Sequence, residues 1–245
     1  MGLTLEEIEG GPVYGPGAGD ALPGVVVVHG GEGPGSGWSH RFAAILAAHG
    51  MLALPVAYGA GDVFGAGRIE DVDLGLIPAA GAALAEHGRC SGRVGLFGWS
   101  MGGEAALLAA AFDPGAFGCV AAHAAPDVIS GAFDPDRFRA TGRVERQRGG
   151  GRAWRWAGAS AGLTPDLEPG ARVPVERVAV PLFLSSGTAD AVVAHAETLA
   201  LASRARQAGR DVDLMVCEGE GHALSMAAEP ALWARLMAFL REHLA

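Results

Sequence analysis

Lysine is missing from this chain of 245 residues, and all 18 of its basic residues are arginines. A Walker-type phosphate loop requires a lysine, so this absence excludes that nucleotide-binding motif. The glycine-rich segments also do not place a GxGxxG dinucleotide pattern between a strand and a helix. Acidic residues exceed basic ones and give a formal net charge of -9, whereas nucleic-acid-binding domains usually carry a basic surface. We therefore expect no nucleic-acid partner.

Cysteines and aromatic residues are also scarce. The three cysteines, Cys90, Cys119 and Cys217, are widely spaced and form no CxxC pair. This spacing favours free thiols over a disulfide framework or a zinc site. Aromatic residues make up only 7% of the chain, so alanine, valine and leucine must fill most of a core. No motif indicates a bound metal or an organic cofactor.

Long apolar runs are absent as well. No unbroken run reaches the length of a membrane-spanning helix. The acidic N-terminal segment lacks the apolar centre of a secretion signal. We therefore expect a cytoplasmic protein with no membrane partner. Because 245 residues is a common length for one α/β domain, we expect residues 1–245 to form a single domain.

What the chain does contain is an alternation of short apolar runs with longer stretches rich in alanine and leucine. The apolar run VVVV at 25–28 is typical of a strand buried on both faces. Further strands are predicted at 51–56, 93–97, 117–122, 181–185 and 212–216. Helices are predicted at 39–49, 68–86, 100–112, 194–208 and 231–243. This order predicts an α/β fold with a mostly parallel sheet and helices on both faces.

The segment 127–178 interrupts the alternation. It is rich in glycine, proline and arginine, and it carries Trp154 and Trp156. A loop of this length is unusual in a compact domain unless it is a lid or an insertion. We predict a cap insertion that lies over the carboxyl ends of the strands.

The sequence GWSMGG at 98–103 is the strongest functional motif. It follows the predicted strand at 93–97 and precedes a predicted helix. This is the context that a G-x-S-x-G nucleophile elbow requires, because the tight turn exposes the serine above the sheet. The simpler alternative is a serine that only caps the helix. We predict that Ser100 is a nucleophile.

A serine hydroxyl needs a base, and we assign that role to His222 in the sequence EGEGH at 218–222. His123 and His195 lie near strand ends and are the competing histidines. The acid that orients the base is predicted to be Asp190, which lies between Ser100 and His222 in the chain order typical of such triads. The competing acids are Asp127, Asp134 and Glu197.

The sequence HGGEG at 29–33 directly follows the first strongly predicted strand. Backbone N–H groups in this loop and after the nucleophile are suited to binding an oxyanion. We therefore predict an oxyanion hole formed by Gly31, Glu32 and Met101. The residues predicted to line the substrate pocket are His29, Trp99, His123, Trp154 and Trp156.

With these residues in place, the chain resembles the α/β-hydrolase superfamily throughout its length. One similar group is that of the dienelactone hydrolases. The segments that resemble this group are HGGEG at 29–33, GWSMGG at 98–103, GTAD at 187–190 and GEGH at 219–222.

A second similar family is the catalytic domain shared by acyl-CoA thioesterases and bile acid-CoA:amino acid N-acyltransferases. The similar segments lie at 42–62, 68–74, 92–111 and 173–190. Ser100 stands where the thioesterase members carry serine and the amino acid transferases carry cysteine. This resemblance implies acyl transfer, with thioesters as candidate substrates.

We therefore expect a serine hydrolase that acts on a small-molecule acyl ester or thioester through an acyl-Ser100 intermediate, without a cofactor. The alternatives are an acyltransferase or cyclase that uses the same triad, and a dienelactone hydrolase-like enzyme that cleaves esters or lactones. A non-enzymatic binding protein on the same scaffold is disfavoured by the intact set of serine, acid and histidine.

Overall fold

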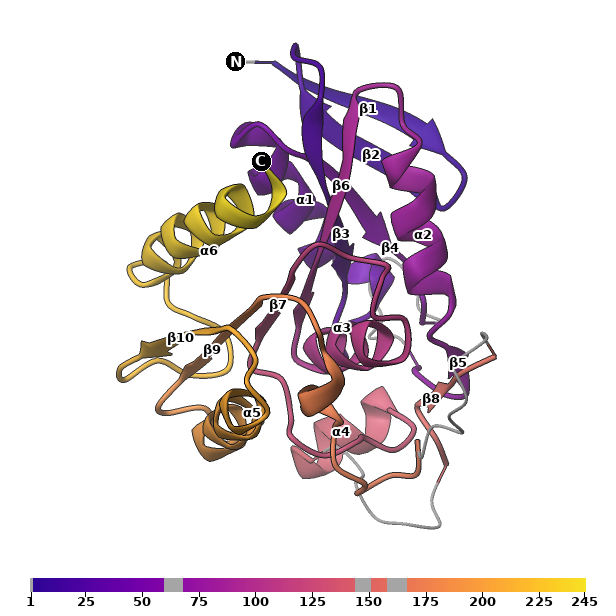
Figure 1. The fold of residues 1–245 in the computed structure, drawn as a ribbon. Coiled ribbons are helices and arrows are strands. Elements are labelled where there is room, and N and C mark those ends of the chain that lie inside the picture. The colour runs from indigo at the N-terminus through magenta and orange to yellow at the C-terminus, as the bar shows by residue number, and fades with distance from the viewer. Residues whose placement is uncertain (1, 60–67, 144–150, 158–166) are drawn as a thin grey trace.

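The protein is described by a computed structural model that covers residues 2–59, 68–143, 151–157 and 167–245. Its centre is an eight-stranded sheet with the strand order β1-β2-β4-β3-β6-β7-β9-β10 (Figure 1). The strands are β1 (Leu3–Ile8), β2 (Gly11–Pro16), β3 (Leu22–Val28), β4 (Leu52–Val56), β6 (Cys90–Trp99), β7 (Val120–His123), β9 (Leu182–Gly187) and β10 (Val212–Cys217). All neighbours from β4 to β10 pair in parallel, whereas β1 and β2 pair in antiparallel fashion.

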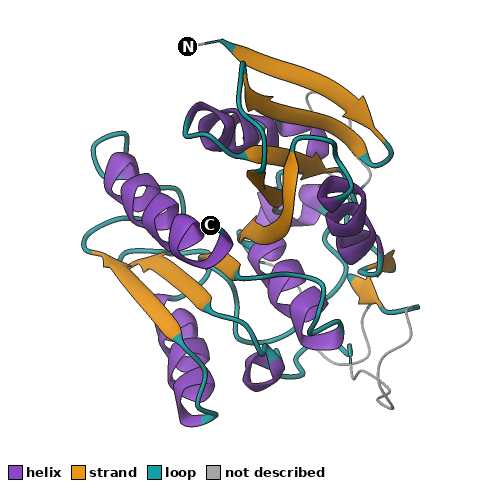
Figure 2. Ribbon diagram, turned by 45° about the horizontal axis from the view of Figure 1, so that its top comes forward, coloured by secondary structure: helices purple, strands orange, loops and turns teal. Residues whose placement is uncertain are grey.

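Helices cover both faces of the sheet (Figure 2). They are α1 (Trp38–Ala48), α2 (Leu76–Ala85), α3 (Met101–Phe112), α4 (Pro135–Thr141), α5 (His195–Gln207) and α6 (Glu229–Leu244). Two short 3-10 helices, η1 (Pro34–Ser36) and η2 (Val175–Arg177), lie in connecting segments. None of the helices in the described part of the chain is long and apolar enough to cross a membrane.

The four valines of β3 show why the sequence requires two helical layers. Val25 and Val27 belong to a core cluster with residues of α1 and α6. Val26 and Val28 belong to the opposite cluster, with residues of α2, α3 and α5. Successive side chains of a strand point to opposite faces, so a strand that is apolar at every position must be covered on both sides.

Helix α3 is the most deeply buried helix described, because all twelve of its residues are buried. Five of these residues are alanines and two are glycines, so the helix can approach the sheet closely. It packs directly against β6 and β7. The residue that precedes it, Ser100, is therefore held between the sheet and a fixed helix.

Among the differences from the sequence prediction, two concern the N-terminal strands and the start of α2. The antiparallel strands β1 and β2 were not predicted, because most of the β1 side chains are exposed and their pattern is not apolar. The helix predicted at 68–86 begins only at Leu76, because Val72 and Asp73 instead form the short strand β5, which pairs with β8 (Trp154–Arg155). Pro78 lies in the first turn of α2, where no intrahelical N–H is lost.

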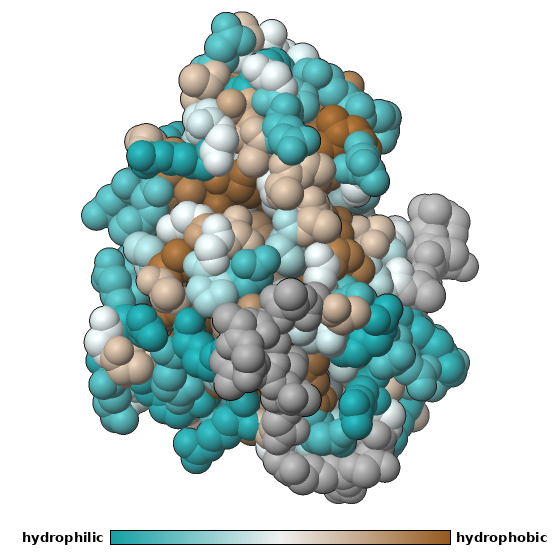
Figure 3. Space-filling model, turned by 45° about the vertical axis from the view of Figure 1, so that its right-hand side comes forward, coloured by the Kyte–Doolittle hydropathy of each residue, from teal (hydrophilic) through white to brown (hydrophobic). Residues whose placement is uncertain are grey.

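The surface is mixed in hydropathy. On the face shown in Figure 3, apolar residues form several separate patches among hydrophilic ones. The three cysteines are free thiols, and Cys119 and Cys217 are buried. Burial raises the pKa of the Cys119 thiol to about 12, so this thiol is unreactive at neutral pH.

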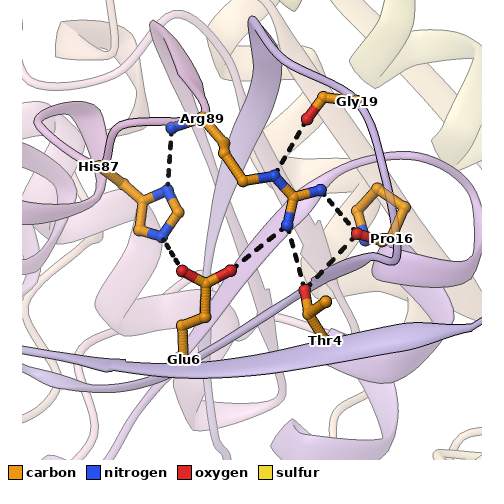
Figure 4. A network of polar contacts seen from close by, with 6 residues as sticks. All are labelled: Thr4, Glu6, Pro16, Gly19, His87 and Arg89. Atoms are coloured by element: carbon orange, nitrogen blue, oxygen red, sulfur yellow. Dashed lines mark hydrogen bonds and ion pairs between the residues drawn. The ribbon is translucent and has the colours of Figure 1, made fainter.

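Arg89 ties the N-terminal hairpin to the loop before β6 (Figure 4). Its guanidinium donates hydrogen bonds to the carbonyl oxygens of Pro16 and Gly19, at 2.6 and 3.0 Å. It also donates to the hydroxyl of Thr4 at 3.2 Å and to a carboxylate oxygen of Glu6 at 3.3 Å. One side chain therefore satisfies acceptors on both strands of the hairpin and on the loop that follows it.

Replacing Arg89 with alanine is expected to lower the free energy of unfolding by about 2–3 kcal/mol, because a hydrogen bond to a charged group typically contributes about 1.5–3 kcal/mol. The side chain is 19% exposed, and solvent screens part of the network. Arg235→Ala is the control, since Arg235 pairs with Asp213 but is 52% exposed. Arg235→Ala is expected to lower the free energy of unfolding by less than about 1 kcal/mol. Urea unfolding measures both, and equal losses would contradict the role of Arg89.

Candidate active site

Ser100 occupies a strained backbone position between β6 and α3. Its φ is 58° and its ψ is -126°, a region that residues other than glycine rarely adopt. The turn is so tight that a Cβ at Gly98 or Gly102 would collide with neighbouring backbone. The Ser100 N–H donates a 2.8 Å hydrogen bond to the carbonyl of His123 at the end of β7. The surrounding strands therefore hold the serine in a conformation that exposes its side chain.

His222 and Asp190 form a hydrogen-bonded pair. Nδ1 of His222 lies 2.8 Å from Oδ2 of Asp190. The other carboxylate oxygen of Asp190 accepts hydrogen bonds from the N–H groups of Val192 and Val193, at 2.8 and 2.9 Å. Burial by itself would raise the pKa of Asp190, but the hydrogen bonds from His222 and from these amides outweigh it and hold the pKa below its usual value. The Asp190 side chain is therefore an anion held against the Nδ1 edge of the imidazole.

The competing acids lie in other surroundings. The N–H of Asp127 donates to the carboxylate of Glu197, at 3.3 Å. The carboxylate of Asp134 caps helix α4 and pairs with Arg68 at 3.0 Å. Among the described residues, Asp190 is the carboxylate that hydrogen-bonds the His222 ring.

The competing histidines are bound to serines of β9. Nδ1 of His195 lies 2.7 Å from the Ser186 hydroxyl. Nδ1 of His123 lies 2.9 Å from the Ser185 hydroxyl. His123 is fully buried, and burial lowers its pKa to about 3. Its ring is therefore neutral inside the core, where it is not placed to accept a proton from Ser100.

Two hollows meet at Ser100. We call the first the aromatic hollow, which has a volume of about 180 Å³. It is lined by Glu32, Trp38, Phe42, Trp99, Ser100, His222 and Ala223. We call the second the cap hollow, which has a volume of about 230 Å³. It is lined by Gly31, Glu32, Ser100, Met101, Phe133, Pro135, Phe138, Arg139, Val192 and His222. Ser100, His222 and Glu32 belong to both linings, so the two hollows adjoin at Ser100.

A larger hollow of about 760 Å³ lies elsewhere, beside α2 and the C-terminal end of α3. Its lining includes Pro78, Phe117 and Trp156 but not Ser100 or His222. The largest volume therefore does not mark the candidate active site. The convergence of ionisable and nucleophilic groups favours the two smaller hollows as the substrate site. No group of three His, Cys, Asp or Glu side chains in the described part of the chain is arranged to hold a metal ion.

The residues predicted for the oxyanion hole all reach these hollows. Gly31 and Met101 line the cap hollow, and Glu32 lines both hollows. Gly31 is in close contact with the ring of Phe133, because a Cβ at this position would lie only 2.8 Å from it. The loop after β3 and the start of α3 therefore meet beside Ser100.

Of the residues predicted to line the pocket, Trp99 lies in the aromatic hollow. The prediction for His29 is wrong, because its side chain is buried and stacks on the ring of Tyr58 with 3.9 Å between centroids. Burial lowers the pKa of His29 to about 4. The prediction for His123 is wrong for the same reason, since its ring packs behind Trp99 with a centroid distance of 3.9 Å. Both histidines belong to the core beneath the site.

The prediction for the two tryptophans of the insertion is also wrong. Trp154 is fully buried, and its Nε1 donates a 2.7 Å hydrogen bond to Glu104 in the first turn of α3. Trp156 packs on the ring of Phe112, the last residue of α3. At 1.5 Å per helical residue, this end of α3 is roughly 18 Å from Ser100. The tryptophans therefore attach the insertion to α3 and do not line the site.

Glu104 explains this attachment. Its carboxylate is fully buried and accepts hydrogen bonds from the Trp154 ring and from both the N–H and the hydroxyl of Ser130, at 2.6 to 2.7 Å. A buried carboxylate needs such donors, because an unpaired charge inside a core is strongly unfavourable. The described part of the insertion is thus bonded to α3 at one turn from Ser100.

Sequence reasoning missed the aromatic residues that do line the hollows. Trp38 and Phe42 come from α1, and Phe133 and Phe138 come from the insertion. For the insertion a signal existed, because Asp134 followed by Pro135 is a typical helix start. This Asp-Pro pair predicts a short helix from Pro135, which carries Phe138 one turn after its start.

A sequence profile described as the prolyl oligopeptidase family matches residues 76–245. No curated protein matches the chain in sequence.

Several solved structures are similar. The dipeptidyl peptidase 4 of Porphyromonas gingivalis has a TM-score of 0.64 and 16% identity, and the match covers 99% of this chain and 35% of that protein. A Klebsiella pneumoniae protein assigned as a dienelactone hydrolase has a TM-score of 0.67 and 18% identity, with 98% of each chain covered. The protein Est1E from Butyrivibrio proteoclasticus, with bound ferulic acid, has a TM-score of 0.62 and 18% identity, with 99% and 96% covered.

These similarities confirm the predicted α/β-hydrolase fold. The chain spans about a third of the length of the dipeptidyl peptidase and nearly the full length of the other two proteins.

Proposed function

The chain belongs to the prolyl oligopeptidase family of serine-hydrolase-type α/β hydrolases, and from that premise we propose that it cleaves carboxylic esters or thioesters of small molecules through an acyl intermediate on Ser100. The observation that carries this proposal is the convergence of a strained, partly exposed Ser100 with His222 at the same two hollows, where His222 is hydrogen-bonded to Asp190.

In the first step, His222 accepts the hydroxyl proton of Ser100 while Oγ attacks the substrate carbonyl carbon. The negative charge that develops on the carbonyl oxygen is stabilised by backbone N–H groups at Gly31 and Met101. Asp190 keeps the proton of the imidazole on Nδ1, so that Nε2 is free to act as the base, and it stabilises the imidazolium that forms. The bond to the leaving group breaks as His222 returns its proton to the departing oxygen or sulfur.

In the second step, a water molecule enters and His222 removes its proton. The hydroxide equivalent attacks the acyl-Ser100 carbonyl, and the proton passes from His222 to Oγ as the acid is released. Every proton is accounted for by Ser100, His222, water and substrate, so the reaction requires no cofactor. The two hollows give the acyl group and the leaving group separate places on either side of Ser100.

The insertion at 127–178 acts in this proposal as a cap. Phe133, Pro135 and Phe138 supply apolar contacts to the cap hollow, which is the usual lining of a small-molecule site. Glu104 keeps the insertion attached to α3 through Ser130 and Trp154. The cap therefore shapes the substrate site without supplying a reacting group.

Thioesters are expected to react faster than alkyl esters of the same acyl group. The segment at 173–190 resembles the thioesterase family, and a thiol with a pKa near 8.5 is a better leaving group than an alkoxide. Partitioning with hydroxylamine tests the shared intermediate. An oxyester and a thioester of one acyl group should give the same ratio of hydroxamate to free acid, because both pass through the same acyl-Ser100. Ratios that depend on the leaving group would contradict the proposal.

A further inference from the structure

Glu32 is a carboxylate inside the site that the acyl-transfer steps do not use. It lines both hollows together with Ser100 and His222. Its Oε1 accepts a 2.8 Å hydrogen bond from the N–H of Gly30. A Cβ placed on Gly30 would lie 2.5 Å from Oε2 of Glu32 and 3.2 Å from Cβ of Ser100. The carboxylate and the nucleophile thus flank the same point.

The position of Glu32 carries a cost that a structural role does not explain. Burial raises the pKa of Glu32 above its usual value, and the backbone hydrogen bond and nearby His222 offset this only in part. A neutral side chain such as glutamine could accept the same hydrogen bond from Gly30. An acidic residue at this position therefore points to a partner that carries positive charge.

The aromatic hollow provides surroundings suited to such a partner. Beside Glu32 its walls are the rings of Trp38, Phe42 and Trp99. The centroid distances are 5.7 Å between Trp38 and Phe42 and 5.3 Å between Phe42 and Trp99, so the three rings form a continuous wall. Aromatic rings attract cations through their electron-rich faces, and this attraction is strongest when the cation is desolvated.

Apart from His222, the described lining of this hollow holds no basic side chain that could pair with Glu32. No arginine belongs to its lining among the described residues. Arg41 lies over the Trp38 ring at 5.5 Å, but it is engaged with both carboxylate oxygens of Glu229. The arginine that does reach the site, Arg139, lines the cap hollow instead. Glu32 lines both hollows, but only in the aromatic hollow is its carboxylate without an arginine among the described lining residues.

We propose that the aromatic hollow binds an alkylammonium group of the substrate, held by the Glu32 carboxylate and the rings of Trp38, Phe42 and Trp99. The volume of about 180 Å³ is several times the space of one water molecule in the liquid, about 30 Å³, so it admits a compact head group. This inference rests on the proposed function and specifies its substrate class: esters or thioesters with a positively charged amine near the scissile carbonyl.

The ammonium group belongs either to the leaving group or to the acyl group, and matched substrate pairs distinguish the two. For the leaving group, the pair is choline acetate and 3,3-dimethylbutyl acetate. For the acyl group, it is the p-nitrophenyl ester of 4-(trimethylammonio)butyrate and that of 5,5-dimethylhexanoate. Within each pair, a quaternary nitrogen replaces a quaternary carbon and the shape is kept. We expect kcat/KM to favour the charged member of one pair by about tenfold to 100-fold, the range of a desolvated cation–π contact combined with an ion pair.

The Glu32→Gln variant should reduce this ratio at least about fivefold, since it removes the charge and keeps the shape. Glu86→Gln is the matched control, because Glu86 is a carboxylate at the end of α2 outside both hollows; it should leave the ratio unchanged. Should Glu32→Gln not fold, Trp38→Leu provides the second test. Trp38 is 42% exposed, so its replacement is tolerated by the fold, and it should lower the ratio as well.

The outcomes separate this inference from the proposed function. Wild-type ratios near one for both pairs, or a preference for the charged substrate that persists in both Glu32→Gln and Trp38→Leu, would overturn the ammonium site alone. Failure of the wild-type protein to hydrolyse any member of either pair, together with p-nitrophenyl acetate and its thioester analogue, would overturn the proposed function itself.

Discussion

Replacing Ser100 with alanine is expected to lower kcat by about 10⁶, leaving only the small acceleration that comes from binding and from the oxyanion hole. The loss is this large because, in the proposed mechanism, Oγ of Ser100 forms the covalent bond to the acyl group, and neither His222 nor Asp190 can replace it. Ser100 precedes α3 in a strained conformation, and alanine fits the same backbone. The fold should therefore persist, and kcat/KM for an activated ester measures the effect.

Ser203→Ala is the matched control for this experiment. Ser203 is an exposed serine on α5, so its hydroxyl can be removed without altering the site. Its activity should equal that of the wild-type protein, and circular dichroism should show both variants folded. Activity of Ser100→Ala within tenfold of wild type would end the acyl-serine account.

Asp190→Asn is expected to lower kcat by roughly 10⁴ in a folded protein. The carboxylate accepts a hydrogen bond from Nδ1–H of His222 at 2.8 Å, whereas an asparagine amide can present its N–H₂ to the same nitrogen. The imidazole then carries its proton on Nε2, where the base must be free. The amide oxygen can still accept the hydrogen bonds from Val192 and Val193, so the loop should keep its shape.

Asp127→Asn serves as the comparison, since Asp127 was the principal rival for the acid. The backbone N–H of Asp127 donates to Glu197 rather than to the His222 ring. Replacing its side chain with asparagine should therefore have little effect on kcat. A large loss in Asp127→Asn combined with a small loss in Asp190→Asn would reassign the acid. The pH profile of kcat adds a second readout, because a changed tautomer should lower activity across the whole profile.

The fold could be predicted where the sequence pattern has a single physical explanation. Four consecutive valines before HGGEG require a strand covered on both faces, and β3 is such a strand. The glycines around Ser100 require a turn too tight for a Cβ, and the structure has that turn. The hairpin of β1 and β2 could not be predicted in this way, because exposed edge strands need no apolar periodicity.

The lining of the site was harder to predict, because it depends on which element packs beside Ser100. Trp154 and Trp156 were natural candidates as large apolar residues of the insertion. Trp154 instead satisfies the buried carboxylate of Glu104, and Trp156 packs at the far end of α3. Phe138 reaches the cap hollow because a short helix begins at Pro135. Which aromatic residues line the hollows therefore depends on tertiary contacts, which a local sequence pattern does not reveal.

The central claim is that Ser100 forms a covalent intermediate, and active-site labelling tests it most directly. The protein is treated with a fluorophosphonate, digested, and sequenced by mass spectrometry. The account predicts one label per chain, located on Ser100, and no label in Ser100→Ala. A wild-type protein that takes up no label, or carries it on a different residue, would contradict the account.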